Sequence, residues 1–335
     1  MITKSSLEKA AEINIIQPEQ IEPLYKFLHE QPEDNLADAR EEPLRFVRSF
    51  GDIYITLGVI FLMLAVHLTE VSGVYFFIPA VGFVLLAEWL VRVRQLVLPG
   101  MVILLSILYF VYRGITQGSD TTALFGLSIV AGTSILFYLR YKMPFSHLPL
   151  AASLVAIFII MLGSDAHKEP AVYAVTGLIV FMVAMWFDSR DTKRVSHLSD
   201  SAFWLHLLGA PLLVHGVMIS LMSISADSWK DIVPPELVIF CVFAVFFLIA
   251  MLVDRRAILV STQLYMIYTI GIIIAKNVSG AGNVLMFGLL TVAMFIIYFG
   301  AYWYKTRKFV YGFLAGKAIT RYIPDLNIED GKAYK

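Results

Sequence analysis

Cysteine is almost absent from the sequence, which has a single thiol, Cys241, inside an apolar run. One cysteine excludes an intrachain disulfide framework and a cysteine-rich metal site, and it gives no indication of the redox compartment. The common catalytic motifs are missing as well, since the chain has no HExxH, GxSxG, P-loop, GxGxxG or CxxC pattern. The hydrolase and nucleotide-binding classes that these motifs mark therefore gain no support.

Charge is scarce and balanced. Charged residues make up 16% of the 335 residues, with 26 basic and 26 acidic side chains and a formal net charge of +0. The basic residues lie beside apolar runs instead of forming a cluster, so we expect no nucleic acid as a partner. Apolar residues make up 59% of the chain, and the mean hydropathy is +0.75. This composition predicts that the chain is surrounded by a lipid bilayer.

The apolar runs are roughly 18–22 residues long, the length that a helix needs to cross about 30 Å of hydrocarbon. A barrel would show short alternating segments instead. The sequence therefore predicts an all-α, polytopic transmembrane bundle of about ten spans. We expect no signal peptide, because the first 48 residues are polar and acidic. The expected spans are 52–69, 73–91, 97–115, 121–139, 147–163, 170–187, 201–222, 234–253, 257–275 and 283–304.

Basic residues alternate in number between successive loops. One set of loops holds nine of them: Arg92, Arg94, Arg140, Lys142, Arg190, Lys193, Arg194, Arg255 and Arg256. The other set holds four: Arg113, Lys168, Lys230 and Lys276. The positive-inside rule places the richer set in the cytoplasm. Because Arg48 precedes the first span and Lys305 follows the last, both ends of the chain are predicted to be cytoplasmic.

Three regions follow from this topology. Residues 1–48 are predicted to form a small cytoplasmic helical module and linker, residues 49–304 the transmembrane bundle, and residues 305–335 a basic amphipathic helix and tail on the inner leaflet. Tryptophan rings suit the headgroup level of a bilayer. Four tryptophans fall at predicted cytoplasmic ends: Trp89, Trp186, Trp204 and Trp303.

The N-terminal module carries two helix signals. Ser5 and Glu8 have the spacing of a capping box, and Pro18 suits the first turn of a second helix over about Glu19 to Glu30. The acidic stretch from Gln31 to Glu42 indicates a linker. Because so small a module buries little apolar surface, we expect it to dock on a partner protein, on a second copy or on the bundle.

A short internal repeat links two cytoplasmic ends. The segment Ala184–Arg190 resembles Ala250–Arg256, and each segment has an acid and an arginine at the end of a span. Glu88, followed by Arg92, lies comparably at the end of the second span. Duplication of helical hairpins would explain the pattern. An alternative is that acids and arginines at helix ends extend to the headgroups independently of one another.

The seventh predicted span is the most polar. At about 1.5 Å per residue, His206 lies roughly 8 Å and His215 roughly 20 Å inside the cytoplasmic boundary. Nine residues apart, they point to opposite faces of a straight helix, so they cannot share one metal ion. Pro211 between them predicts a kink, and Gly209 allows a neighbouring helix to approach closely.

Ionisable groups at membrane depth are functional candidates because hydrocarbon disfavours charge. A proton path through His206 toward His215 would start from four cytoplasmic acids, Glu88, Asp188, Asp200 and Asp254. The alternative is a kinked packing helix whose histidines bond to other spans. A haem held by His147 with His206, or by His67 with His215, is a further alternative. The sequence predicts no other cofactor and no metal site.

Parts of the chain resemble a class of uncharacterised bacterial inner-membrane proteins, grouped as domains of unknown function. In these proteins a short cytoplasmic helical module precedes a many-helix bundle. The resemblance lies in Leu7-Glu8-Lys9-Ala10-Ala11, Ile15-Ile16-Gln17-Pro18-Glu19-Gln20, Leu57-Gly58-Val59, and Ala202-Phe203-Trp204-Leu205-His206-Leu207-Leu208 with Pro211 and His215. It implies a location in the bacterial inner membrane and brings no catalytic residues with it.

Three functions fit these observations. The first is transport of a small solute or ion, including proton-coupled transport, through the polar seventh span. The second is a membrane scaffold or sensor that recruits a partner through its cytoplasmic ends. The third is an intramembrane redox or transferase enzyme, which is the least expected. A water-filled cavity beside His206 and His215 would favour transport, whereas dry packing around them would favour the scaffold.

Overall fold

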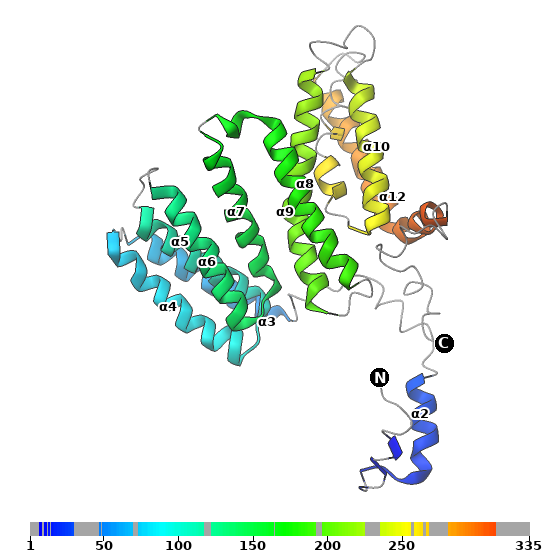
Figure 1. Cartoon of the computed structure of the whole chain (residues 1–335). Coiled ribbons are helices and arrows are strands. Elements are labelled where there is room, and N and C mark those ends of the chain that lie inside the picture. Colours follow the sequence, from blue (N-terminus) through cyan, green and yellow to red (C-terminus); the bar gives the residue numbers. More distant parts are fainter. Residues whose placement is uncertain are drawn as a thin grey trace. The chain divides into compact units, whose positions relative to one another are not determined.

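The computed structural model describes residues 7–8, 10–11, 13, 15–29, 47, 49–69, 73–116, 122–163, 165–191, 196–224, 235–255, 258–263, 266–267 and 281–312. Every regular element among these residues is helical (Figure 1). The chain divides into two units, one of Met1–Arg45 with Leu326–Lys335 and one of Phe46–Asp325. The predicted all-α class is confirmed.

The smaller unit contains the predicted second helix. A 3-10 turn, η1 (Pro18–Gln20), leads into α2 (Ile21–His29). The backbone N–H of Gln17 donates to Oε1 of Gln20 at 2.9 Å, which satisfies one donor at the start of this turn. Ser5 and the predicted linker at 31–42 lie outside the described residues.

The larger unit holds the apolar helices. They are α3 (Phe50–His67), α4 (Phe77–Ala87) with η3 (Gly73–Phe76) before it and η4 (Glu88–Val93) after it, α5 (Val97–Thr116), α6 (Ala123–Tyr141), η6 (Pro144–Ser146) with α7 (His147–Met161), η7 (Ala166–Lys168) with α8 (Pro170–Arg190), α9 (His197–Ile224), α10 (Pro235–Val253) and α12 (Ala281–Gly312). In the described part of the chain, eight helices are long and apolar enough to cross a membrane.

These eight helices match the first seven predicted spans and the last one. The eighth prediction, 234–253, coincides with α10, whose apolar segment Leu237–Val253 is shorter than the other candidates. Within the ninth, 257–275, residues 258–263 and 266–267 are helical, and the rest lies outside the described residues. Large apolar side chains such as Phe61, Leu85 and Ile297 are exposed on the helix surfaces. Such surfaces fit a hydrocarbon environment.

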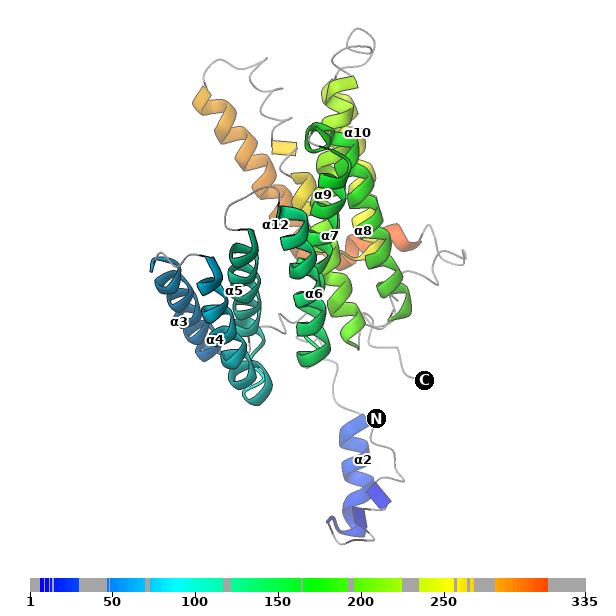
Figure 2. The same cartoon turned by 60° about the vertical axis from the view of Figure 1, so that its left-hand side comes forward.

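Within the first four spans, α3, α4 and α6 pack against α5 (Figures 1 and 2). Phe110 of α5 is fully buried, and its ring stacks on Phe83 of α4 at 5.8 Å between centroids. A second apolar cluster joins α9, α10 and α12 around Met218, Met251 and Trp303. These two apolar clusters form cores of the bundle. The polar side chains described below lie at the ends of the same helices.

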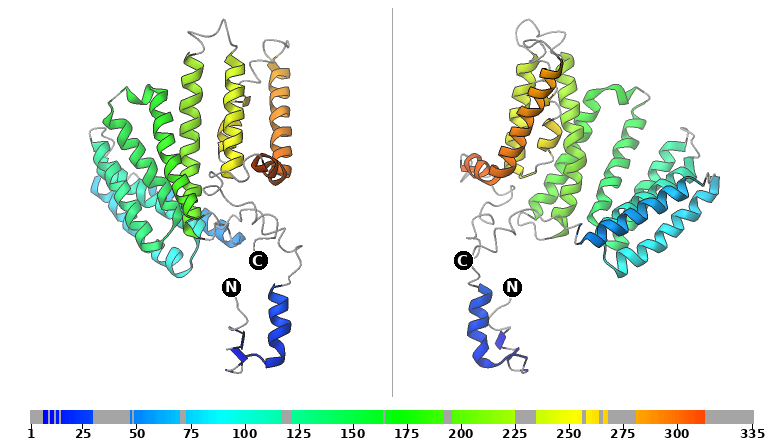
Figure 3. Two further views of the ribbon diagram at one scale, coloured as in Figure 1. Left: turned by 45° about the vertical axis from the view of Figure 1, so that its right-hand side comes forward. Right: turned by 180° about the vertical axis from the view of Figure 1, so that it is seen from behind.

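The helix α12 bends at Tyr302, where the backbone leaves helical geometry (φ −111°, ψ 20°), and its last part turns away (Figure 3). A separate amphipathic helix from residue 305 was predicted, and residues 305–312 are indeed helical, within this bent end of α12. Residues from 313 onward lie outside the described part. The side chain of Trp303, which was predicted to lie among headgroups, is buried in the second apolar cluster.

Helices α8 and α9 touch through their backbones. A Cβ atom added to Gly177 would lie 2.2 Å from the backbone N of Leu213, and one added to Gly216 would lie 2.1 Å from the backbone N of Ala174. At Gly209 the same atom would lie 2.9 Å from the backbone N of Phe181. The close approach expected at Gly209 is therefore confirmed, and two further glycines extend it along the hairpin.

Replacing Gly177 with alanine should destabilise the protein by about 3 kcal/mol or more, because the backbone of α9 cannot move aside as a flexible side chain can. The matched control is Gly132→Ala in α6, where no heavy atom lies within 4 Å of the new Cβ. That substitution should stabilise the helix by about 0.5–1 kcal/mol. Unfolding midpoints in detergent measure both effects, and shifts of the same sign would contradict the close contact.

Candidate functional site

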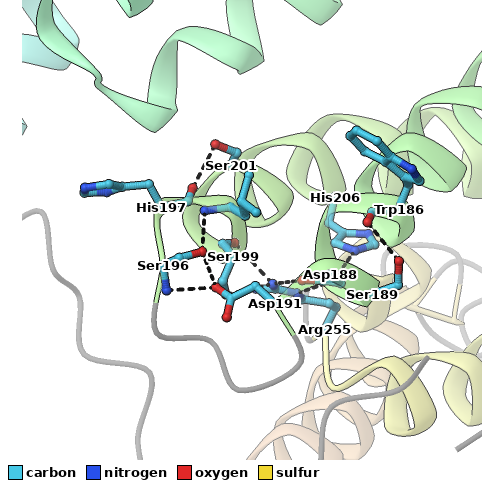
Figure 4. Close-up of polar contacts among 11 residues, drawn as sticks. Trp186, Asp188, Ser189, Asp191, Ser196, His197, Ser199, Ser201, His206 and Arg255 are labelled. Carbon is cyan, nitrogen blue, oxygen red and sulfur yellow. Dashed lines mark hydrogen bonds and ion pairs between the residues drawn. The ribbon is translucent and has the colours of Figure 1, made fainter. Parts of the chain in front are cut away.

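The carboxylate of Asp188 is the centre of a buried polar cluster. It lies in the last turn of α8, and Nε2 of His206 on α9 donates to its Oδ2 at 2.9 Å (Figure 4). The side chains of Asp188 and His206 are 1% and 0% exposed. The glycine contacts between α8 and α9 hold the two residues side by side, although 18 residues separate them in sequence.

Arg255 completes the charge balance of this cluster. Its Nη2 donates to Oδ1 of Asp188 at 2.5 Å and its Nε to Oδ2 at 3.2 Å, a two-point contact that matches the planar guanidinium to the carboxylate. Nη2 also donates to the backbone oxygen of Ser199 at 3.3 Å. We call Asp188, His206, Arg255 and Ser199 the Asp188 cluster. It joins α8, α9 and the residue that follows α10.

An apolar ring lies against the histidine of the Asp188 cluster. The ring of Phe181 packs edge-on against His206 with centroids 4.9 Å apart. A charge removed from water needs a partner in a medium of low dielectric constant. Arg255, itself 3% exposed, supplies that partner for Asp188. The cluster thus neutralises two charges inside the bundle and fixes the relative positions of three helix ends.

The turn that precedes α9 has its own polar contacts. Asp191 accepts from the backbone N–H of Ser196 at 2.8 Å and from its hydroxyl at 2.7 Å (Figure 4). Asp200 lies in the first turn of α9, where its half-buried side chain has Oδ2 at 3.8 Å from Nδ1 of the exposed His197. In sequence it directly follows Ser199, a member of the Asp188 cluster.

Two further acids of the predicted pathway form separate groups at helix ends. Glu88, in the π-helical turn η4, accepts from Nε and Nη2 of Arg140 at 2.9 Å each and from the hydroxyl of Tyr141 at 2.9 Å. Asp254 accepts from Nε1 of Trp303 at 2.7 Å and lies 3.8 Å from Nε of Arg307. The structure thus distributes Glu88, Asp188 and Asp254 over three acid–arginine groups.

His215 and Pro211 lie away from these groups. His215 is exposed on α9, and its ring packs edge-on against Tyr173 at 5.9 Å. Pro211 is also exposed, and α9 continues through it as one helix from His197 to Ile224. The structure therefore brings together Asp188 and His206 of the predicted site residues, and it does not bring His215 to them.

Sequence reasoning missed the arginines of these groups. Arg140 and Arg255 are predicted to be loop charges, yet each of them, like Arg307, lies against an acid that is more than 50 residues away. The signal that could have found them was the repeated acid and arginine at the ends of the spans. The alternative that these side chains extend independently to the headgroups is wrong for Asp188 and Arg255, because both are buried.

The histidines considered for haem have unrelated surroundings. Nδ1 of His67 lies 2.7 Å from the hydroxyl of Tyr109, and Nδ1 of His147 donates to the backbone oxygen of Pro144 at 3.1 Å. His206 is bonded to Asp188, as described above. Among the described residues, no group of three or more histidine, cysteine, aspartate or glutamate side chains is arranged to hold a metal ion.

The fold and this site define a multi-pass α-helical membrane protein whose helix ends are joined by acid–arginine pairs. Comparison with protein-family models gave no match. Comparison with curated proteins and with solved structures gave no match either. The resemblance to bacterial proteins noted in the sequence therefore stays a prediction.

Replacing Asp188 with asparagine should destabilise the protein by about 3–5 kcal/mol, because it leaves the charge of Arg255 buried without its counter-charge. The control Asp165→Asn breaks the exposed pair with Lys168, whose side chains are 80% and 66% exposed. It should change stability by about 0–1 kcal/mol.

The double variant Asp188→Leu with Arg255→Met removes both charges and should be more stable than Asp188→Asn alone. Unfolding midpoints of the detergent-purified variants report all three values. Equal midpoints for Asp188→Asn and Asp165→Asn would show that the Asp188 cluster is not the structural link we describe.

Proposed function

We propose that this chain is a membrane scaffold or sensor that recruits a partner protein through its cytoplasmic end segments. The observation that carries the proposal is the small unit at the N-terminus, which is separate from the membrane unit. It exposes Ile13 and Ile15, with exposed fractions of 68% and 70%. Large apolar side chains that a small unit exposes to water favour docking of another protein.

The surroundings of the two histidines also support the scaffold. His206 is packed against Phe181 and bonded to Asp188, and His215 lies exposed elsewhere on α9. A solute or proton path through both residues would need a shared water-filled cavity. Among the described residues, one pocket of about 340 Å³ in the membrane unit is lined by residues of α7, α8 and α9 that include neither His206 nor His215.

Transport of a small solute or ion, including proton-coupled transport, is the second candidate. The observation that favours it is the Asp188 cluster itself. Burying ionisable groups within a membrane protein costs free energy, and such groups commonly mark ion or proton pathways. A cluster near one end of the bundle would then act as a gate or proton site, with His206 and Asp188 as its titratable members.

The paired substitution Ile13→Ser and Ile15→Ser should abolish binding of the recruited protein, because it removes the exposed apolar contact. The partner is first captured by crosslinking in intact cells and identified, and its purified form is then titrated onto the full chain in detergent. We expect at least a tenfold loss of affinity for the paired variant, since each buried isoleucine contributes about 1.5–3 kcal/mol. Glu19→Ser, an exposed residue of the same unit, is the control and should bind normally.

Unchanged affinity in the Ile13 and Ile15 variant, and in a chain that lacks residues 1–45, would contradict the scaffold. Reconstituted vesicles test the second candidate with the same protein. Flux of protons or ions that is lost in a folded His206→Ala variant would favour transport. Flux that does not differ from that of empty vesicles would remove it.

The topology that we propose has ten spans with both ends in the cytoplasm of a bacterial inner membrane. The alternation of basic residues between loops supports the orientation, and the resemblance in the N-terminal segment supports the location. The helical residues at 258–263 and 266–267 support a ninth span between α10 and α12.

A labelling experiment checks this orientation. In a Cys241→Ser background, a cysteine introduced at Lys168 should react with a membrane-impermeant thiol reagent in intact cells. A cysteine at Lys142 should react only after the membrane is opened. Both positions are exposed at helix ends, so accessibility within the protein is comparable. The opposite result at the two positions would reverse the proposed orientation.

A further inference from the structure

An apolar groove runs between α7 and α8. Its volume is about 340 Å³, within the range of roughly 300–1,000 Å³ found for small-ligand sites. It extends along α7 from His147 to Phe158 and along α8 from Thr176 to Phe187, with Leu205 of α9 also lining it. The groove exists because α8 packs closely on α9, whereas α7 packs mainly on α6 and α9 and makes few contacts with α8.

The dimensions of the groove match one leaflet of a bilayer. The eleven-residue step from His147 to Phe158 spans roughly 16 Å at about 1.5 Å per residue. Half of a hydrocarbon core of about 30 Å is roughly 15 Å. A narrow hydrocarbon chain of this length suits a groove that is lined almost entirely by apolar side chains.

The polar end of the groove is formed by His147. The other lining residue with a polar side chain, Thr176, donates its hydroxyl to the backbone oxygen of Val172 at 2.7 Å. Nδ1 of His147 donates to the backbone oxygen of Pro144 at 3.1 Å, and this leaves Nε2 as the ring nitrogen that can meet a ligand. A ligand with one polar end would therefore place that end beside His147.

A row of aromatic rings crosses this end of the groove. The ring of His147 lies 4.4 Å from Tyr138 on one side and 5.7 Å from Phe187 on the other. Phe187 in turn lies 5.1 Å from the half-exposed Trp186. Aromatic rings with polar atoms collect at the boundary between hydrocarbon and headgroups. The row therefore marks the headgroup level of the bilayer.

A cation lies at each end of this aromatic row. Nζ of Lys142 is 5.6 Å from the centre of the Tyr138 ring, and Cζ of Arg190 is 3.9 Å from the centre of the Trp186 ring. In the described part of the chain neither cation pairs with a carboxylate, whereas Arg140 and Arg255 do. Two such cations at the headgroup level on either side of an apolar groove complement a negatively charged headgroup.

We propose that the α7–α8 groove binds one anionic phospholipid, with an acyl chain between the helices and its headgroup beside His147, at the aromatic row that Lys142 and Arg190 flank. The acyl chain of the lipid makes the apolar contacts along the groove. The two cations select a negatively charged headgroup over a zwitterionic one. This binding site is independent of the recruiting role proposed for the N-terminal unit.

Two sets of variants test the groove and its headgroup site separately. Ala151→Phe places a ring inside the groove, and its control Ala65→Phe places one on the exposed surface of α3. Lys142→Gln with Arg190→Gln removes the two flanking cations. Its control, Arg94→Gln with Lys305→Gln, removes two cations that lie over Trp89 and Tyr302 elsewhere.

The measurement is native mass spectrometry of the full chain, delipidated in detergent and titrated with phosphatidylglycerol, phosphatidylcholine or inorganic phosphate. The wild type should retain one phosphatidylglycerol at concentrations where phosphatidylcholine is not retained. Removing the two cations should weaken phosphatidylglycerol binding roughly tenfold to thirtyfold, since each contributes about 1 kcal/mol at the surface. Ala151→Phe should abolish retention, and both controls should bind as the wild type does.

Three results would overturn the proposal. Equal retention of phosphatidylglycerol and phosphatidylcholine would show that the site does not select an anionic headgroup. Wild-type binding in Ala151→Phe, or in the variant without Lys142 and Arg190, would place the lipid elsewhere. Displacement of the phospholipid by inorganic phosphate alone would show a simple anion site. Because Lys142 and Arg190 lie on the surface, their variant tests the site even where Ala151→Phe does not fold.

Discussion

The carboxylate of Asp188 is the point on which the second half of the bundle depends. A carboxylate that is 1% exposed cannot keep its charge in an apolar environment without a partner. Arg255 provides the opposite charge and His206 a hydrogen bond, and each comes from a different part of the chain. Their contacts require the end of α8, the first half of α9 and the end of α10 to meet at one place.

The glycine contacts make this meeting possible. Because Gly177, Gly209 and Gly216 have no side chains, α8 and α9 lie against each other along their backbones. The same close pairing separates α8 from α7 and leaves the groove between them. The tight contact of α8 with α9 and the groove between α8 and α7 thus have the same cause, the close packing of α8 on α9.

The polar groups at the helix ends divide into two kinds. In the first kind, an acid and an arginine form an ion pair that connects two helices, as Glu88 does with Arg140 and Asp188 with Arg255. In the second kind, cations such as Lys142 and Arg190 lie over aromatic rings without an acid. The first kind explains the architecture of the bundle. The second kind lies on the exposed surface of the helices, and it is the basis of the lipid site that we propose.

The sequence by itself determined the class of protein and the positions of eight helices, because the length of an apolar run and the distance across hydrocarbon are properties of a local segment. It also identified Asp188 and His206 as unusual. Only the tertiary structure decided that Arg255 binds Asp188, that Trp303 is buried and that His215 lies apart. The residues in such contacts are 18 to 67 positions apart in the chain, and their meeting depends on which helix faces pack together, which no local pattern specifies.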